Sequence, residues 1–209
     1  MALANNIPTN CWSGTMLGVD YDQLPHWVVD YGCYSLTLHC ADSIPKGALE
    51  KLREYVAHQS AIESTDDDFL QQNRRQFKMM EHYLDQSMGA CPLRPVKIRQ
   101  SLTNYLTAYD EELRFKSWVI MPNHLHLITD PMRFSSTDAF KKAITRFKMR
   151  STRYVNLSAK RSGKLWMSSA YDRWIRSESE YRRWIDYLRN NPAKAGLCSS
   201  PDEWIGLKI

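Results

Sequence analysis

The sequence has few of the features that mark a secreted, disulfide-bonded or membrane-spanning protein. Its five cysteines are scattered among 209 residues, and no two of them have the CxxC spacing. This usage argues against a disulfide framework and against a structural zinc site. No apolar run is long enough to cross a bilayer. The first twelve residues lack the basic and apolar regions of a secretory signal. We therefore expect a protein of the reducing cytoplasm.

Acidic residues are absent from one long segment, residues 141–170, which carries nine basic ones. Because the whole chain has a formal net charge of only +5, the remaining residues are net acidic. A concentrated positive segment suits a polyanion such as nucleic acid, although a solvated helix face is the alternative. The DNA-binding candidates in this run are Lys141, Lys142, Arg146, Lys148, Arg150 and Arg153.

Internal repeats and low-complexity segments are also absent, so we expect one domain over residues 30–209 after a loosely structured lead-in, residues 1–29. Alternation predicts a half-buried strand over 34–40 and a strand pair within 113–128, broken at Pro122. Apolar spacing predicts helices over 48–56 and 72–84, after Pro95, after Ser135, and from Ser177 to near Pro192. Residues 63–68 are predicted to form an acidic loop, and residues 164–175 an extended segment. This order predicts an α+β sandwich, with helices packed on an antiparallel sheet.

His124 and His126 form the sharpest local feature. Residues two apart in a strand point to the same face, so both imidazoles project together while Leu125 and Leu127 point to the opposite, buried side. Two adjacent imidazoles are a natural pair of metal ligands. The alternative is a chance pair on a polar strand surface.

Tyr187 occupies an unusual position on the last predicted helix. The apolar stripe of that helix contains Tyr181, Trp184, Ile185 and Leu188, and Tyr187 falls about 100° from the centre of the stripe. Asn191 lies one turn further along the same flank. Tyr187 is therefore predicted at the boundary between core and exterior, which fits an exposed nucleophile or an ordinary interfacial tyrosine.

Four motifs in order resemble the single-tyrosine HUH transposases. Residues 121–128 (MPNHLHLI) resemble their "MPNHxH" signature, and residues 186–197 (DYLRNNPAKAGL) resemble "YIxxNPVxAGL" with Ala193 in place of valine. Between them, residues 163–166 (GKLW) and 171–176 (YDRWIR) match two further segments. Residues 83–93 resemble a stretch of the branch called REP-associated tyrosine transposases. The agreement covers roughly residues 31–204.

The resemblance implies a ferredoxin-like fold and a metal-dependent enzyme that breaks and rejoins single-stranded DNA, a substrate that includes hairpin DNA in the REP-associated branch. In such a protein Tyr187 is the nucleophile and forms a 5′-phosphotyrosine, and His124 and His126 bind Mg²⁺ or Mn²⁺. We expect Asn191 to be the third protein ligand; its alternative role is a cap at the helix C-terminus. Further DNA-binding candidates are Trp166, Arg173 and Arg176.

Two other function classes remain open from the sequence. One is a metal-dependent nucleic-acid hydrolase in which a metal-bound water attacks, and the other is a DNA-binding module without catalysis. The sequence also leaves open whether the protein is a monomer or a homodimer, and whether the tyrosine acts in its own subunit or across a dimer. We expect a location with the DNA, in the nucleoid of the cytoplasm.

Overall fold

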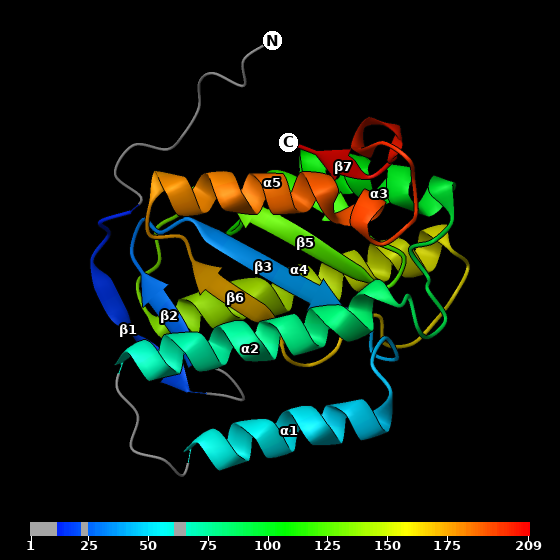
Figure 1. Cartoon of the computed structure of the whole chain (residues 1–209). Coiled ribbons are helices and arrows are strands. Elements are labelled where there is room, and N and C mark those ends of the chain that lie inside the picture. The colour runs from blue at the N-terminus through cyan, green and yellow to red at the C-terminus, as the bar shows by residue number, and fades with distance from the viewer. Residues whose placement is uncertain (1–11, 22–24, 61–65) are drawn as a thin grey trace.

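The computed structural model describes residues 12–21, 25–60 and 66–209, and its centre is a five-stranded antiparallel sheet with the order β6-β3-β5-β4-β7 (Figure 1). A separate two-stranded sheet precedes it in the chain. The strands are β1 (Met16–Tyr21), β2 (Pro25–Val29), β3 (Tyr34–His39), β4 (Phe115–Ile120), β5 (His124–Thr129), β6 (Tyr171–Trp174) and β7 (Leu207–Lys208).

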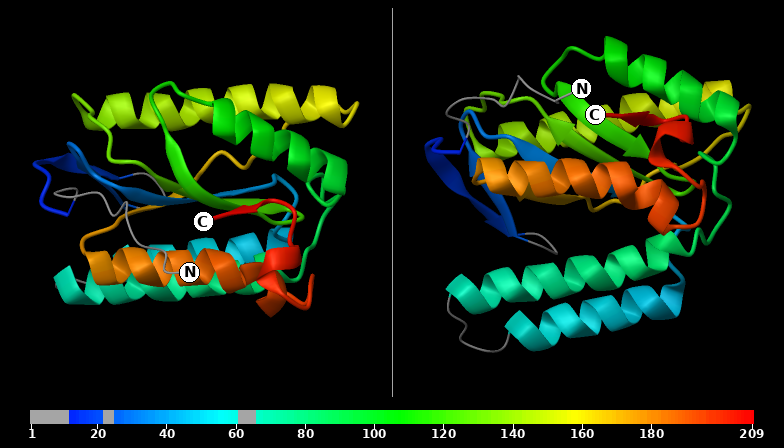
Figure 2. Two further views of the ribbon diagram at one scale, coloured as in Figure 1. Left: turned by 90° about the horizontal axis from the view of Figure 1, so that it is seen from above. Right: turned by 45° about the horizontal axis from the view of Figure 1, so that its top comes forward.

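Helices cover both faces of the large sheet (Figure 2). On one face α3 and α4 pack side by side, and on the other lie α5 and the antiparallel pair of α1 and α2. The helices are α1 (Lys46–Ser60), α2 (Asp66–Asp85), α3 (Val96–Ala108), α4 (Thr137–Ser158) and α5 (Glu178–Lys194), with a short 3₁₀ turn at Pro201–Glu203.

The connection of these elements confirms the α+β sandwich that was predicted. The chain runs through β3, the helices α1 to α3, β4, β5, α4 and β6, while the spatial order of these four strands is β6-β3-β5-β4. A strand–helix–strand–strand–helix–strand sequence with this order is the ferredoxin-like arrangement. The strands β3 and β5 therefore lie at the centre of the sheet, where they are paired on both sides.

Period-two alternation gives the two faces of the sheet different contents. Leu125 and Leu127 point into the larger core, which α3 and α4 complete with the buried Leu102 and Phe147. The opposite face of β5 carries His124, His126 and Ile128 toward α2 and α5. Because helices cover this face too, every residue of β3 and β5 is buried. The prediction that the first strand is only half-buried is therefore wrong.

Three local predictions differ from the structure. Residues 16–21 and 25–29, expected to lack regular structure, pair as the antiparallel strands β1 and β2. Residues 66–68 are the first turn of α2 rather than loop, while 63–65 lie outside the described residues. Helix α5 continues past Pro192 to Lys194. Proline is tolerated there because it removes only one backbone hydrogen bond, close to the helix end.

No helix in the described part of the chain is long and apolar enough to span a membrane.

Candidate active site

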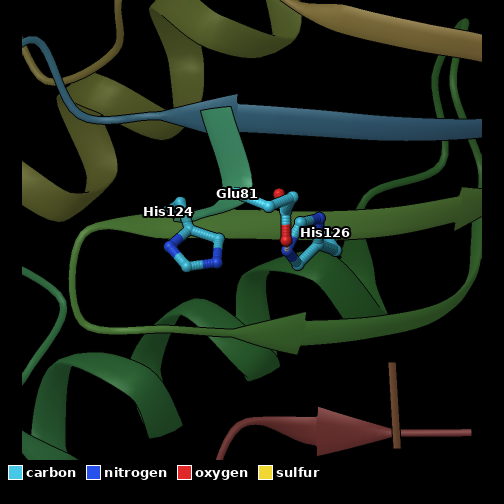
Figure 3. Close-up of side chains that lie close together, drawn as sticks. All are labelled: Glu81, His124 and His126. Carbon is cyan, nitrogen blue, oxygen red and sulfur yellow. Dashed lines mark ion pairs between the residues drawn. The ribbon is translucent and has the colours of Figure 1, made fainter. Parts of the chain in front are cut away.

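Pairing within the sheet places the two histidines at its centre. His126 lies opposite Thr37 on β3 and opposite Val119 on β4, and His124 lies opposite His39. The imidazole rings of His124 and His126 are 4.7 Å apart and nearly perpendicular (Figure 3). Both project from the same side of β5, as the alternation predicted.

Each imidazole has one nitrogen engaged by the protein and the other directed into the site. The Nδ1 atom of His124 is 2.8 Å from Oδ1 of Asn123, and Nδ1 of His126 is 2.8 Å from Oγ1 of Thr37. A hydrogen bond at Nδ1 fixes the ring and leaves Nε2 for a metal ion. Burial lowers the pKa of His126 to about 3 and that of His124 well below its usual value. Both rings are therefore neutral, which is the form that binds metal.

Glu81, on α2, completes a cluster that the sequence did not reveal. Its carboxylate Oε2 is 3.7 Å from Nε2 of His126, and ligand atoms of Glu81, His124 and His126 all lie within 4.8 Å of one another (Figure 3). Burial, followed by the charge of Asp85, raises the pKa of Glu81 to about 8. A carboxyl group buried beside two imidazoles is costly unless a cation or a proton neutralises it.

Tyr187 reaches this cluster from α5. Its hydroxyl donates a hydrogen bond to Oε2 of Glu81 and lies 3.4 Å from Nε2 of His126. The ring itself is half-buried, at the predicted boundary between core and exterior. Histidines, carboxylate and tyrosine thus meet within one chain, although Glu81 and Tyr187 are 106 positions apart.

Several buried polar atoms of the cluster and of α5 have no hydrogen-bond partner among the described residues. They are Nε2 of His124, Oε1 of Glu81, and both side-chain amide atoms of Asn191. Buried polar groups are nearly always paired, so a cluster of unpaired ones indicates a missing partner. Imidazole nitrogen, carboxylate oxygen and amide oxygen are donors that fit a divalent cation.

Asn191 is buried inside α5, one turn beyond Tyr187. It does not cap the helix, because the C-cap position belongs to Ala195. The capping alternative is therefore wrong.

The two other tyrosines that could replace Tyr187 as a nucleophile occupy different positions. Tyr154 stacks on Tyr105 between α3 and α4, across the sheet from the histidines. Tyr171 is buried on β6, with its ring 4.4 Å from that of Phe77. Neither is among the groups that contact the cluster of Glu81, His124 and His126 in the described structure.

The DNA-binding candidates do not gather around this cluster. Lys141, Lys142, Arg146, Lys148, Arg150 and Arg153 all lie on α4, across the sheet from the histidines. Arg146 pairs with Glu112 at 2.7 Å, Arg150 pairs with Glu111, and Lys148 donates to the backbone oxygen of Ser168. Arg173 lies on β6 and bonds Glu180 of α5, and Arg176 lies between β6 and α5 in the chain, with its guanidinium over the rings of Trp27 and Trp174.

Trp166 is a correction to the set of DNA-binding candidates. Its side chain is 2% exposed, and its Nε1 donates to Oγ of Ser151 at 2.9 Å. The ring belongs to the core between the sheet and α4, so no face is left to stack on a base.

Comparison with known proteins supports the resemblance seen in the motifs. No family model matches the chain. The chain is similar to a REP-associated tyrosine transposase of Escherichia coli (strain K12), with 27% identity over 96 residues. That match covers 46% of this chain and 53% of the relative, so it spans about half the relative's length. A solved structure of a REP-associated tyrosine transposase bound to a REP hairpin gives a TM-score of 0.45 at 14% identity, over 88% of this chain and 79% of that one.

Proposed function

We propose that this protein cuts and rejoins single-stranded DNA, with Tyr187 as the nucleophile. The observation that carries the proposal is the meeting of the Tyr187 hydroxyl with His126 and Glu81 beside His124. A phenol has an ordinary pKa of about 10 and needs a neighbour that takes its proton. The similarity to a REP-associated tyrosine transposase supports the same reaction class.

The cation is proposed to be Mg²⁺ or Mn²⁺, held by His124, His126, Glu81 and Asn191. Its oxygen donors are one carboxylate, one amide and water, which favours these ions over softer metals. When bound, the cation would polarise the scissile phosphate and neutralise the charge that develops on it.

Glu81 is proposed to accept the proton of Tyr187. Its Oε2 already receives the hydrogen bond from that hydroxyl, while Oε1 has no hydrogen-bond partner among the residues described and is available as a ligand. A general base must lie within hydrogen-bond reach of the proton that it takes, and the contact between the Tyr187 hydroxyl and Glu81 meets that condition.

In the covalent step the proton of Tyr187 passes to Glu81, the Tyr187 oxygen forms a bond to phosphorus, and the bond from phosphorus to the 3′ oxygen breaks. The 3′ oxygen leaves and takes up a proton from water, which makes it a 3′-hydroxyl. The product is a 5′-phosphotyrosine. The phosphotyrosine linkage is still a phosphodiester. A second 3′-hydroxyl can therefore attack its phosphorus, release Tyr187 and join new DNA ends without ATP.

Hairpin DNA is the proposed substrate class, because the similar solved protein is described with a REP hairpin bound and the curated relative is named as REP-associated. Cleavage would fall in single-stranded DNA next to the hairpin.

The rival functions make different products. A hydrolase using a water nucleophile cleaves without attaching the DNA, and a binding module does not cleave at all. The test is incubation of the protein and Mg²⁺ with single strands from the DNA flanking its own gene, followed by a denaturing gel. We expect a covalent adduct that Tyr187→Phe abolishes. Cleavage without an adduct would establish the hydrolase, and binding without cleavage the module.

A further inference from the structure

An open pocket lies directly beside the nucleophile. It has a volume of about 410 Å³, within the range of about 300–1,000 Å³ that small-molecule sites occupy, and Tyr187 forms part of its wall. The rest of the wall comes from α2, β6 and the first half of α5. The proposed metal ligands His124 and His126 are not part of this lining, so the pocket adjoins the cluster through Tyr187.

Aromatic rings form one side of the pocket. Phe77 is central, with its ring centroid 4.4 Å from Tyr171, 5.6 Å from Trp184 and 6.2 Å from Tyr187. Aromatic residues in a closed core would pack against one another alone, whereas these rings also line open space. Phe77 and Trp184 are half-buried, while Tyr171 is buried behind Phe77. Partly exposed aromatic rings near cationic side chains are surfaces on which unpaired nucleobases stack.

The polar part of the lining is net positive. Lys78 and Arg183 are exposed at the pocket, and Arg173 lines it as well. Among the described residues that line the pocket, the only carboxylate is Glu180, which bonds Nε of Arg173 at 2.6 Å and the backbone nitrogen of Arg176. Its charge is therefore already compensated. A neutral ring system flanked by phosphates matches this combination of aromatic wall and cationic rim.

We propose that this pocket holds the nucleobase immediately 3′ of the scissile phosphate, an inference that rests on the proposed strand cleavage by Tyr187. In an in-line displacement the leaving 3′ oxygen departs on the side of phosphorus opposite the attacking oxygen. The nucleotide 5′ of the break therefore lies away from Tyr187. The nucleoside 3′ of the break stays bonded to phosphorus, and after cleavage it is attached to Tyr187 itself, whose side chain forms part of the pocket wall.

The experiment first maps the cleavage position from the adduct, then compares three oligonucleotides: the intact strand, one with an abasic site at the first position 3′ of the break, and one abasic at the first position 5′. Single-turnover adduct formation gives the half-saturating concentration of protein. Stacking of one base is worth roughly tenfold in affinity. We expect the 3′ abasic strand to need about tenfold more protein, and the 5′ abasic strand to behave like the intact one.

Variants assign the effect to the pocket. Phe77→Leu keeps an apolar side chain but removes the central ring, so the difference between intact and 3′ abasic strands should shrink to less than about threefold. Arg183→Gln should weaken binding of both strands alike. Arg182→Gln is its matched control, because Arg182 is the neighbouring exposed arginine, pairs with Glu178 and does not line the pocket.

A readout independent of cleavage uses the Tyr187→Phe variant and a strand with 2-aminopurine at the first position 3′ of the break. The fluorescence of 2-aminopurine should fall when this variant binds the strand. In the double variant Tyr187→Phe, Phe77→Leu the fluorescence should stay close to that of the free strand. Equal half-saturation by the intact and 3′ abasic strands, with a normal adduct, overturns the pocket assignment and leaves the proposed function standing. Absence of any wild-type adduct overturns the proposed function instead. Thermal unfolding of each variant separates loss of fold from loss of base stacking.

Discussion

The Tyr187 hydroxyl donates a hydrogen bond to the buried carboxylate of Glu81. Loss of this hydroxyl therefore affects both the reaction and the stability of the fold. Tyr187→Phe should reduce covalent adduct below detection while DNA affinity changes less than about twofold, since one hydroxyl is a small part of a strand-wide interface. Removing this hydrogen bond should lower the free energy of unfolding by about 0.5–1.5 kcal/mol. Gel detection of adduct and chemical denaturation check the two effects.

The matched control for this change is Tyr154→Phe, on the far side of the sheet, which should keep full adduct formation. Adduct retained by Tyr187→Phe would falsify the nucleophile assignment and direct attention to Tyr171, the next tyrosine in the neighbouring pocket.

Glu81 combines a hydrogen bond to the nucleophile with a place among the proposed metal ligands. Glu81→Gln keeps an oxygen that accepts from Tyr187 but removes the charge. We expect adduct formation to slow at least about 100-fold, as for loss of a general base, and Mn²⁺ to raise the melting temperature less than in the wild type. Without metal, the variant should be as stable as the wild type, because a neutral amide is cheaper to bury than a carboxylate.

Surface Glu112→Gln provides the control, since Glu112 pairs with Arg146 on the opposite side of the sheet. An unchanged rate for Glu81→Gln, with Mn²⁺ stabilisation intact, would show that Glu81 neither accepts the proton nor binds the metal.

At the scale of elements, α5 carries both the proposed nucleophile and the proposed amide ligand on one rigid segment. Asn191 is buried, and its side-chain amide has no hydrogen-bond partner among the described residues, which costs stability unless a ligand pairs it. Asn191→Ala should therefore leave the metal-free melting temperature unchanged or higher. It should raise the Mg²⁺ concentration for half-maximal cleavage about tenfold or more, with activity partly restored at high Mg²⁺. A lower melting temperature with an unchanged Mg²⁺ requirement contradicts the ligand role.

Elements with a strong local signal could be predicted from the sequence. The alternation around Pro122 predicted β4, the turn and β5, and hence the shared direction of His124 and His126. The last helix begins after Ser177 as expected, and Ser177 accepts a hydrogen bond from the backbone nitrogen of Glu180. The cap of α4 is Ser136, which accepts from the backbone nitrogen of Ala139, rather than Ser135. These features depend on residues close in the chain, so a local pattern is sufficient.

Features that depend on distant contacts were not predictable in this way. Glu81 was inside a predicted helix, but nothing local shows that its side chain meets that of His126, far along the chain. Burial of the histidines was missed for the same reason, because α2 and α5 cover that face only in the folded chain. The strand pair of β1 and β2 has weak alternation and is held partly by His26, which bonds Asp172 on β6.

For the whole molecule, the proposed site is assembled within one chain, so no partner subunit has to supply the tyrosine. Mixing His126→Ala with Tyr187→Phe should then give no adduct, since each protein lacks one half of its own site. Restored adduct formation in the mixture, checked at several protein ratios on a denaturing gel, would instead show an exchange of α5 between subunits.

The basic face of α4 and the candidate active site lie on opposite sides of the sheet, so they should act separately. Lys142 and Arg153 are exposed on α4. Replacing both with alanine should flatten the salt dependence of hairpin-DNA binding by about 0.9 for each phosphate that the protein no longer neutralises. Cleavage of a short, unstructured strand should stay within about twofold of wild type, because such a strand needs only the Tyr187 side. Lys78→Ala with Arg183→Gln should instead slow cleavage of the short strand and leave the salt dependence of hairpin binding unchanged.

Two results would contradict this separation of the two faces. If the α4 variant slows cleavage of the short strand, the single strand must run around the sheet edge to α4. If the salt dependence of hairpin binding does not change in the α4 variant, the positive charge of α4 is only a solvated helix face.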